Sequence, residues 1–312
     1  MRRFTNRLFF FASAVLLMCT AAQAQVASCS TAGTDNAFLG IRTINLWPGE
    51  PPQAKGHGCN DIPTITIVSP RQGAENGSAV IIFPGGGYAH LAGDLEGREI
   101  ADWFTARGFR AFIVAYRLTL NGYVLPVPLL DARRAIQTVR AHAADYHVQA
   151  NRIVVIGFSA GGHLAALSGT KFVAGDAHAA DPIERASSRP DYLVLGYPWL
   201  GAITTDTSHL GYCEKFNLMD RCAALKAAYT PEALVTRDTP PTFIYHTFSD
   251  RAVPVEQSLG FYNALLKAGV PAEIHIFVNG DHASGLGRGD PALDQWPVLL
   301  ENWLRSYGLL TP

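Results

Sequence analysis

The feature that most constrains this chain is a Gly-x-Ser-x-Gly pattern at residues 157–161, which directly follows the apolar, β-branched run 153–156. Such a short apolar run is typical of a buried parallel strand, and residues 159–172 have a helical pattern. In a tight strand-to-helix turn, glycines two residues before and after the serine avoid steric clash. The pattern therefore predicts such a turn, with Ser159 as a candidate nucleophile. An ordinary glycine-rich turn is the alternative.

Apolar runs alternate with amphipathic segments from residue 64 onward. This alternation predicts an α/β fold with a mostly parallel central sheet and helices on both faces. The expected strands are 64–68, 80–83, 111–116, 153–156, 192–195, 242–246 and 273–278, and the expected helices are 99–106, 129–144, 159–172, 255–268 and 295–307. The pattern shows no repeat or linker, so residues 25–312 are expected to form one domain.

Residues 198–240 break this alternation, because they contain no clear strand and end before the double proline at 240–241. Ligands bind α/β proteins at the carboxyl edge of the sheet, where loops often carry function. We expect this segment to be a short cap inserted over that edge. A structural excursion far from any site is the alternative.

The first 24 residues have the features of a secretory signal peptide. Arginines precede the apolar run 8–18, and Ala22-Gln23-Ala24 provides a small-x-small cleavage pattern. A membrane anchor needs about 20 apolar residues, and this run is shorter. Cleavage after Ala24 would release a secreted or periplasmic protein without a membrane anchor.

The charge balance excludes several kinds of partner. The chain has 25 basic and 26 acidic residues, and loss of the three arginines in the leader leaves 22 basic residues. No basic run or stripe favours nucleic acid or an anionic membrane. Four charged residues inside the motifs described below are expected mainly to hold the fold through ion pairs: Glu96, Arg117, Asp131 and Arg134.

Four cysteines remain after removal of the leader, and an oxidising compartment favours two disulfides. Proximity in sequence favours Cys29 with Cys59 and Cys213 with Cys222, although four cysteines permit three pairings. Free buried thiols are the alternative. A zinc site is disfavoured because no Cys-x-x-Cys or paired histidine spacing accompanies them.

A serine hydroxyl needs a base within hydrogen-bond reach and a third group that orients the base. Two later turns supply candidates in the order serine, acid, histidine. Asp250 follows the expected strand 242–246, and His282 lies in a glycine-bounded loop after the expected strand 273–278. We therefore expect Ser159, Asp250 and His282 to form a catalytic triad.

Other residues compete for the last two roles. The chain has ten histidines, and the position after the last strand selects His282. His163 lies close to the serine in sequence but is expected to pack within the fold. Asp281 and Glu256 are the alternatives to Asp250. Asp281 adjoins His282 too closely to orient it easily, and Glu256 opens a helix.

The glycines Gly85, Gly86 and Gly87 follow the expected strand 80–83. Consecutive glycines let the backbone approach a substrate without a Cβ clash, and backbone N–H groups stabilise an oxyanion. We expect Gly86 and Gly87 to form an oxyanion hole with the N–H of Ala160. The sequence leaves open which two of the three glycines donate, and a tight turn without a ligand is the alternative.

Aromatic residues near these motifs are candidates for substrate binding. Tyr88 follows the glycines, and Trp199 and Tyr212 lie in the predicted cap, with Tyr197 at its start. Rigid aromatic walls predict a small acyl pocket that prefers acetyl.

The chain resembles the acetylxylan-esterase-like group of bacterial carbohydrate esterases, within the α/β-hydrolase superfamily. That group includes enzymes described as bifunctional acetylxylan and feruloyl esterases. The motifs that carry the resemblance cover nearly all of the chain after the leader: 46–49 (LWPG), 84–88 (PGGGY), 95–97 (LEG), 116–118 (YRL), 131–135 (DARRA), 157–165 (GFSAGGHLA) and 303–310 (WLRSYGLL).

This resemblance implies an α/β-hydrolase fold and hydrolysis of short acyl esters on plant cell-wall polysaccharide. It places Ser159, Asp250 and His282 at the matching catalytic positions. Two departures bear on the substrate: Ala283 stands where glycine often follows the histidine, and the segment with Cys213 and Cys222 is longer.

The expected function is therefore that of a secreted serine carboxylesterase acting on acetylated polysaccharide or a small ester. The alternatives are a broader carboxylesterase, a feruloyl esterase or lipase-like hydrolase, a peptidase of the same fold, and a catalytically dead carbohydrate-binding protein. A peptidase usually carries a propeller or large cap. No metal, nucleotide or flavin cofactor is implied, and the oligomeric state is left open.

Overall fold

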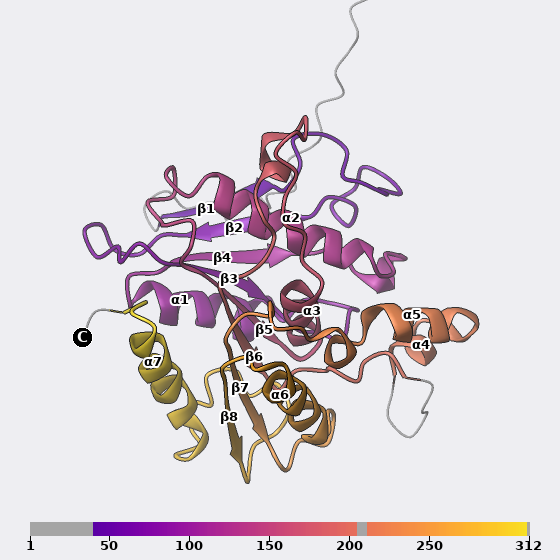
Figure 1. Cartoon of the computed structure of the whole chain (residues 1–312), viewed down its shortest axis with the longest axis vertical. Helices are drawn as coiled ribbons and strands as arrows, with labels where there is room; N and C mark the ends of the chain where they lie inside the picture. The colour runs from indigo at the N-terminus through magenta and orange to yellow at the C-terminus, as the bar shows by residue number, and fades with distance from the viewer. Residues whose placement is uncertain (1–39, 205–210, 311–312) are drawn as a thin grey trace, which may run out of the picture.

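A computed structural model describes residues 40–204 and 211–310 and contains one eight-stranded sheet in the order β1-β2-β4-β3-β5-β6-β7-β8 (Figure 1). Strands β3 to β8 run parallel, whereas β2 pairs antiparallel with both β1 and β4. The mostly parallel sheet expected from the sequence is confirmed. The strands are β1 (Ile41–Asn45), β2 (Thr64–Val68), β3 (Ala79–Phe83), β4 (Arg110–Ala115), β5 (Ile153–Phe158), β6 (Tyr192–Gly196), β7 (Thr242–Thr247) and β8 (Ala272–Phe277).

Helices cover both faces of the sheet, as Figure 1 shows. Leu300 of α7 and Phe104 of α1 belong to one hydrophobic cluster, whereas Leu164 of α3, Ile136 of α2 and Phe261 of α6 belong to a second cluster. The α-helices are α1 (Glu99–Thr105), α2 (Val127–Ala141), α3 (Ser159–Thr170), α4 (Tyr212–Lys215), α5 (Cys222–Tyr229), α6 (Glu256–Ala268) and α7 (Trp296–Ser306), and a π-helical turn spans Gly93–Arg98. The sheet therefore lies between two helical layers.

The burial of the strands explains which of them the sequence reveals. Every residue of β3 and β5 is buried, as expected for central strands covered on both faces. Each expected strand and each expected helix begins and ends within three residues of the corresponding observed element. Strand β1 was not predicted, because only Ile41 of its five residues is buried and its pattern is that of a mixed edge strand.

Two of the expected ion pairs are present and hold α2 against its neighbours. Arg117 and Asp131 are both buried, and Nη2 of Arg117 lies 2.6 Å from Oδ1 of Asp131. Arg134, on the same helix as Asp131, pairs at 2.6 Å with Asp181. The ring of Trp47 lies within 5.8 Å of the guanidinium groups of both arginines. Burial of paired charges makes removal of one partner costly, so these residues fix how the chain packs around α2.

Residues 198–240, which were expected to form a cap, contain α4 and α5 and no strand among the described residues. A disulfide joins Cys213 of α4 to Cys222 at the start of α5, which confirms this expected pairing. Cys59 is exposed, and its expected partner Cys29 lies outside the described residues, as does the predicted leader. None of the described helices is long and apolar enough to span a bilayer.

Replacing Cys213 and Cys222 by serine should lower the free energy of unfolding by about 2 to 3 kcal/mol, because a bond over a short loop limits the unfolded chain. The two cysteines are nine residues apart. Urea denaturation of the two proteins measures the difference. Recovery of alkylated Cys213 from unreduced protein would contradict the expectation.

Candidate active site

Ser159 lies at the turn where β5 passes directly into α3. Its φ of 52° is left-handed, a conformation that non-glycine residues rarely adopt. A Cβ on Gly157 would lie 2.2 Å from the carbonyl oxygen of Gly161, and one on Gly161 would lie 2.0 Å from the carbonyl oxygen of Phe83. Both glycines are therefore required for the turn, which presents the Ser159 side chain at the carboxyl edge of the sheet.

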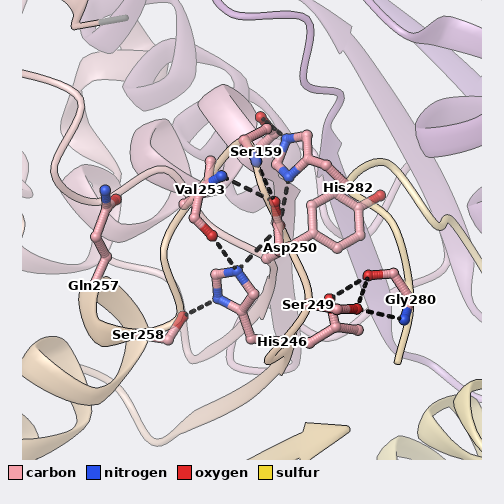
Figure 2. A network of polar contacts seen from close by, with 12 residues as sticks. Ser159, His246, Ser249, Asp250, Val253, Gln257, Ser258, Gly280 and His282 are labelled. Atoms are coloured by element: carbon pink, nitrogen blue, oxygen red, sulfur yellow. Dashed lines mark hydrogen bonds and ion pairs between the residues drawn. The ribbon is translucent and has the colours of Figure 1, made fainter. Parts of the chain in front are cut away.

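Three side chains from separate loops meet at this turn (Figure 2). Nε2 of His282 lies 2.8 Å from Oγ of Ser159, and Nδ1 of His282 lies 2.7 Å from Oδ2 of Asp250. Asp250 is in the turn after β7, and His282 is in the loop after β8. This hydrogen-bonded order has the geometry of a nucleophile, a base and an orienting acid.

The surroundings of Asp250 favour its ionised form. Burial by itself would raise the pKa of Asp250, but hydrogen bonds from His246, His282 and the backbone N–H of Val253 lower it well below its usual range. Oδ1 accepts hydrogen bonds from the N–H groups of Ala252 and Val253, both at 2.9 Å. Asp250 is therefore a fixed carboxylate at neutral pH.

The competing residues lie elsewhere. His163 is fully buried, and its two ring nitrogens contact the hydroxyl of Tyr88 and the carbonyl oxygen of Tyr229. Burial lowers the pKa of His163 to about 4, so it is a neutral structural residue. Asp281 and Glu256 are exposed, and in the described chain neither side chain accepts a hydrogen bond from His282.

Ser159 and His282 line a cavity of about 530 Å³, whereas Asp250 does not border it. Trp199 contributes to its wall, and the backbone N–H of Trp199 donates to the carbonyl oxygen of Ser159 at 2.9 Å. Within the two described ranges, no cluster of three potential metal-ligating side chains occurs. The lining residues are Gly86, Gly87, His90, Ala92, Glu96, Ser159, Trp199, Lys215, Arg251, Ala252, Val253, His282 and Ala283.

The glycine loop after β3 borders the same cavity. The N–H of Gly85 donates to Oε2 of Glu96 at 2.6 Å and is thereby occupied. Gly86 and Gly87 have left-handed φ values of 121° and 61°, and in the described chain their N–H groups have no acceptor. The N–H of Ala160 lies in the first turn of α3, where N–H groups have no acceptor within the helix. Three backbone donors thus remain available near Ser159.

Comparison with known proteins gives the same fold. A family model named BD-FAE matches residues 65–188, and the prolyl oligopeptidase family model matches residues 131–306. An acetyl ester-xyloside bifunctional hydrolase from Caldicellulosiruptor lactoaceticus is 38% identical, with a TM-score of 0.79 over 86% of this chain and 97% of that chain. The chain belongs to the α/β-hydrolase family.

Other relatives of this hydrolase are esterases as well. The acetylxylan esterase of Xylanibacter ruminicola is 32% identical over 74% of this chain and 46% of its own length, so the hydrolase spans about half of that relative. The esterase Est2 from Thermogutta terrifontis, in its propionate-bound structure, is 27% identical with a TM-score of 0.70 over 88% of this chain and 96% of that chain.

Only one of the three aromatic residues expected to bind substrate borders the cavity of the hydrolase. Tyr88 and Tyr212 are both fully buried, and their rings contact each other with centroids 5.4 Å apart. The hydroxyl of Tyr212 lies 2.8 Å from the hydroxyl of Thr119, whereas that of Tyr88 contacts His163. The expectation for these two tyrosines is corrected: they pack behind the cavity wall, and Trp199 borders the cavity.

Glu96 differs from its expected role in an ion pair. It is 1% exposed, and no cation pairs with it among the described residues. Its Oε1 accepts a hydrogen bond from the hydroxyl of Tyr197, which in turn accepts one from the N–H of Gly285. Burial raises the pKa of Glu96, although the hydrogen bonds from Tyr197 and Gly85 oppose the rise. Glu96 thus connects the glycine loop to the loop that carries His282.

Replacing Glu96 by alanine should lower kcat/KM for p-nitrophenyl acetate about 10- to 100-fold, because the glycine loop loses the acceptor that fixes Gly85. Asp94→Ala is the matched control: it removes an exposed acid from the same helical turn and should leave the rate unchanged. Steady-state kinetics on both folded variants measures the effect. If Glu96→Ala keeps the wild-type rate, as Asp94→Ala should, Glu96 does not support the site.

Proposed function

We propose that this hydrolase is an exported serine carboxylesterase that removes short acyl groups, chiefly acetyl, from plant cell-wall polysaccharide. The observation that carries the proposal is the hydrogen-bonded series Asp250, His282, Ser159 at the cavity. The names of the relatives, acetylxylan esterase and acetyl ester-xyloside hydrolase, support the acetylated substrate. The signal-peptide pattern of residues 1–24 supports export, and residues 25–312 would then be the single catalytic domain with the cap 198–240.

In the first half-reaction, Oγ of Ser159 attacks the ester carbonyl carbon while its proton passes to Nε2 of His282. Asp250 holds the Nδ1–H of His282 and stabilises the imidazolium ion. The oxyanion accepts hydrogen bonds from the N–H groups of Gly86, Gly87 and Ala160. Collapse of this intermediate breaks the bond to the sugar oxygen, which takes the proton from Nε2 and leaves the acetyl group on Ser159.

In the second half-reaction, water takes the place of the sugar. His282 accepts a proton from the water as its oxygen attacks the acetyl carbonyl carbon. The second tetrahedral intermediate uses the same backbone donors. Its collapse breaks the bond to Oγ of Ser159, returns the proton from His282 to that oxygen and releases acetic acid, which ionises at neutral pH.

We place the acyl group against Trp199, because its rigid ring is the large aromatic side chain that borders the cavity. The backbone N–H of Trp199 also donates a hydrogen bond to the carbonyl oxygen of Ser159, which fixes its position. The exposed Lys215, Arg251 and Ala252 border the cavity toward solvent, which leaves that side for a sugar chain. A broader carboxylesterase, a feruloyl esterase or a lipase-like hydrolase is the second candidate, since the same triad serves larger acyl groups.

Ser159→Ala and His282→Ala should each lower kcat by about 10⁴-fold or more, because the triad residues act as one unit. Asp250→Asn should also be severe, since an amide favours the wrong tautomer of His282. Kinetics with p-nitrophenyl acetate, on variants that keep the native circular dichroism spectrum, measures these losses. Glu256→Gln is the matched control. More than a tenth of the wild-type rate in Ser159→Ala would overturn the triad.

For p-nitrophenyl esters, kcat/KM should fall from acetate to butyrate and be very low for octanoate, because an overfilled pocket misaligns the carbonyl group. Trp199→Ala should shift the preference toward longer acyl chains, whereas Trp103→Ala, on α1 outside the cavity, should not. A rate that rises through octanoate would favour the lipase-like alternative. Efficient cleavage of methyl ferulate would favour a feruloyl esterase, and efficient cleavage of a prolyl p-nitroanilide would favour a peptidase.

A further inference from the structure

A second histidine contacts the carboxylate of Asp250. His246 lies in β7, four residues before Asp250, and its side chain is fully buried. Its Nε2 lies 3.2 Å from Oδ2 of Asp250 and 3.0 Å from the carbonyl oxygen of Val253. Its Nδ1 lies 2.8 Å from Oγ of Ser258 on α6 (Figure 2). His246 does not line the cavity.

These neighbours define which ring nitrogen carries the proton. An ionised carboxylate and a carbonyl oxygen can only accept hydrogen bonds, so Nε2 of His246 must be the donor. The hydroxyl of Ser258 can donate to Nδ1. Oδ2 of Asp250 therefore receives N–H groups from two histidines, His246 and His282.

The carboxylate of Asp250 is thereby held at all of its acceptor positions. Oδ1 accepts two backbone N–H groups, and Oδ2 accepts the two imidazole N–H groups. A carboxylate offers about four such positions, so removal of the His246 donor leaves one position unfilled and weakens the restraint on the orientation of Asp250. Its orientation determines where Nδ1 of His282 is held, and hence how Nε2 of His282 meets Ser159.

We propose that His246 is a positioning residue for the esterase reaction, which acts through Asp250 on His282 by donating its Nε2–H to the shared oxygen Oδ2. The inference rests on the proposed catalytic triad. His246 touches neither substrate nor the reacting atoms, so its removal should lower kcat and leave KM within about twofold of the wild-type value.

Two amide variants separate this role from simple packing. The amide nitrogen of glutamine falls near the position of a histidine Nε2, whereas that of asparagine falls near Nδ1. His246→Gln should therefore retain the donor to Asp250 and keep kcat within about threefold, whereas His246→Asn and His246→Leu should lose about 10- to 100-fold. Equal losses in the glutamine and asparagine variants would overturn the proposal.

Ser159→Ala, measured in parallel, separates a failure of the proposed triad from a failure of the role proposed for His246. If that variant remains active, the proposed triad fails; if it is inactive while His246→Asn retains the wild-type kcat, only the role of His246 fails. Should the His246 variants not fold, nitrogen-15 NMR of the histidine-labelled wild-type chain decides the matter. A neutral Nε2–H tautomer for His246 supports the proposal, and an Nδ1–H tautomer overturns it.

Discussion

The left-handed backbone at Ser159 is the constraint on which the rest of the site depends. The turn exists because Gly157 and Gly161 let β5, α3 and the end of β3 approach one another more closely than any Cβ permits. The same close approach brings the glycine loop after β3 beside the serine. The carbonyl group of Ser159 then accepts a hydrogen bond from the N–H of Trp199, so the segment after β6 is attached to the turn as well. One tight turn therefore positions the nucleophile, the backbone donors and the cavity wall together.

Much of the fold and part of the site could be predicted because their signals are local. The buried parallel strands appear as apolar runs. Asp250 follows the buried strand β7 and His282 follows the partly exposed strand β8, in the order the chemistry requires. Tyr88 could not be placed in this way, because its direction depends on a left-handed turn (φ 57°) and on His163, a partner 75 residues away. Glu96 could not be placed either, since its neighbours are an N–H and a hydroxyl rather than a cation.

Buried polar side chains connect loops that the sheet alone would leave independent. Glu96 joins the glycine loop to Tyr197, and Tyr197 reaches the loop of His282 through Gly285. His246 connects β7 and α6 to Asp250 in the same manner. Hydrogen bonds inside a protein are strong and directional, so a satisfied network defines one arrangement of loops. The geometry of the site is therefore a property of this network as much as of the triad.

The disulfide between Cys213 and Cys222 lies close to the site, so the redox conditions under which a sample is prepared affect the site. Helix α4 carries both Cys213 and Lys215, and the ammonium group of Lys215 donates to the carbonyl oxygen of Gly87. A molecule that lacks the bond keeps the sheet but holds α4 less firmly against the glycine loop. Material prepared partly under reducing conditions is then a mixture of two species that differ beside the reacting ester. Thiol titration belongs among the first measurements on any purified batch.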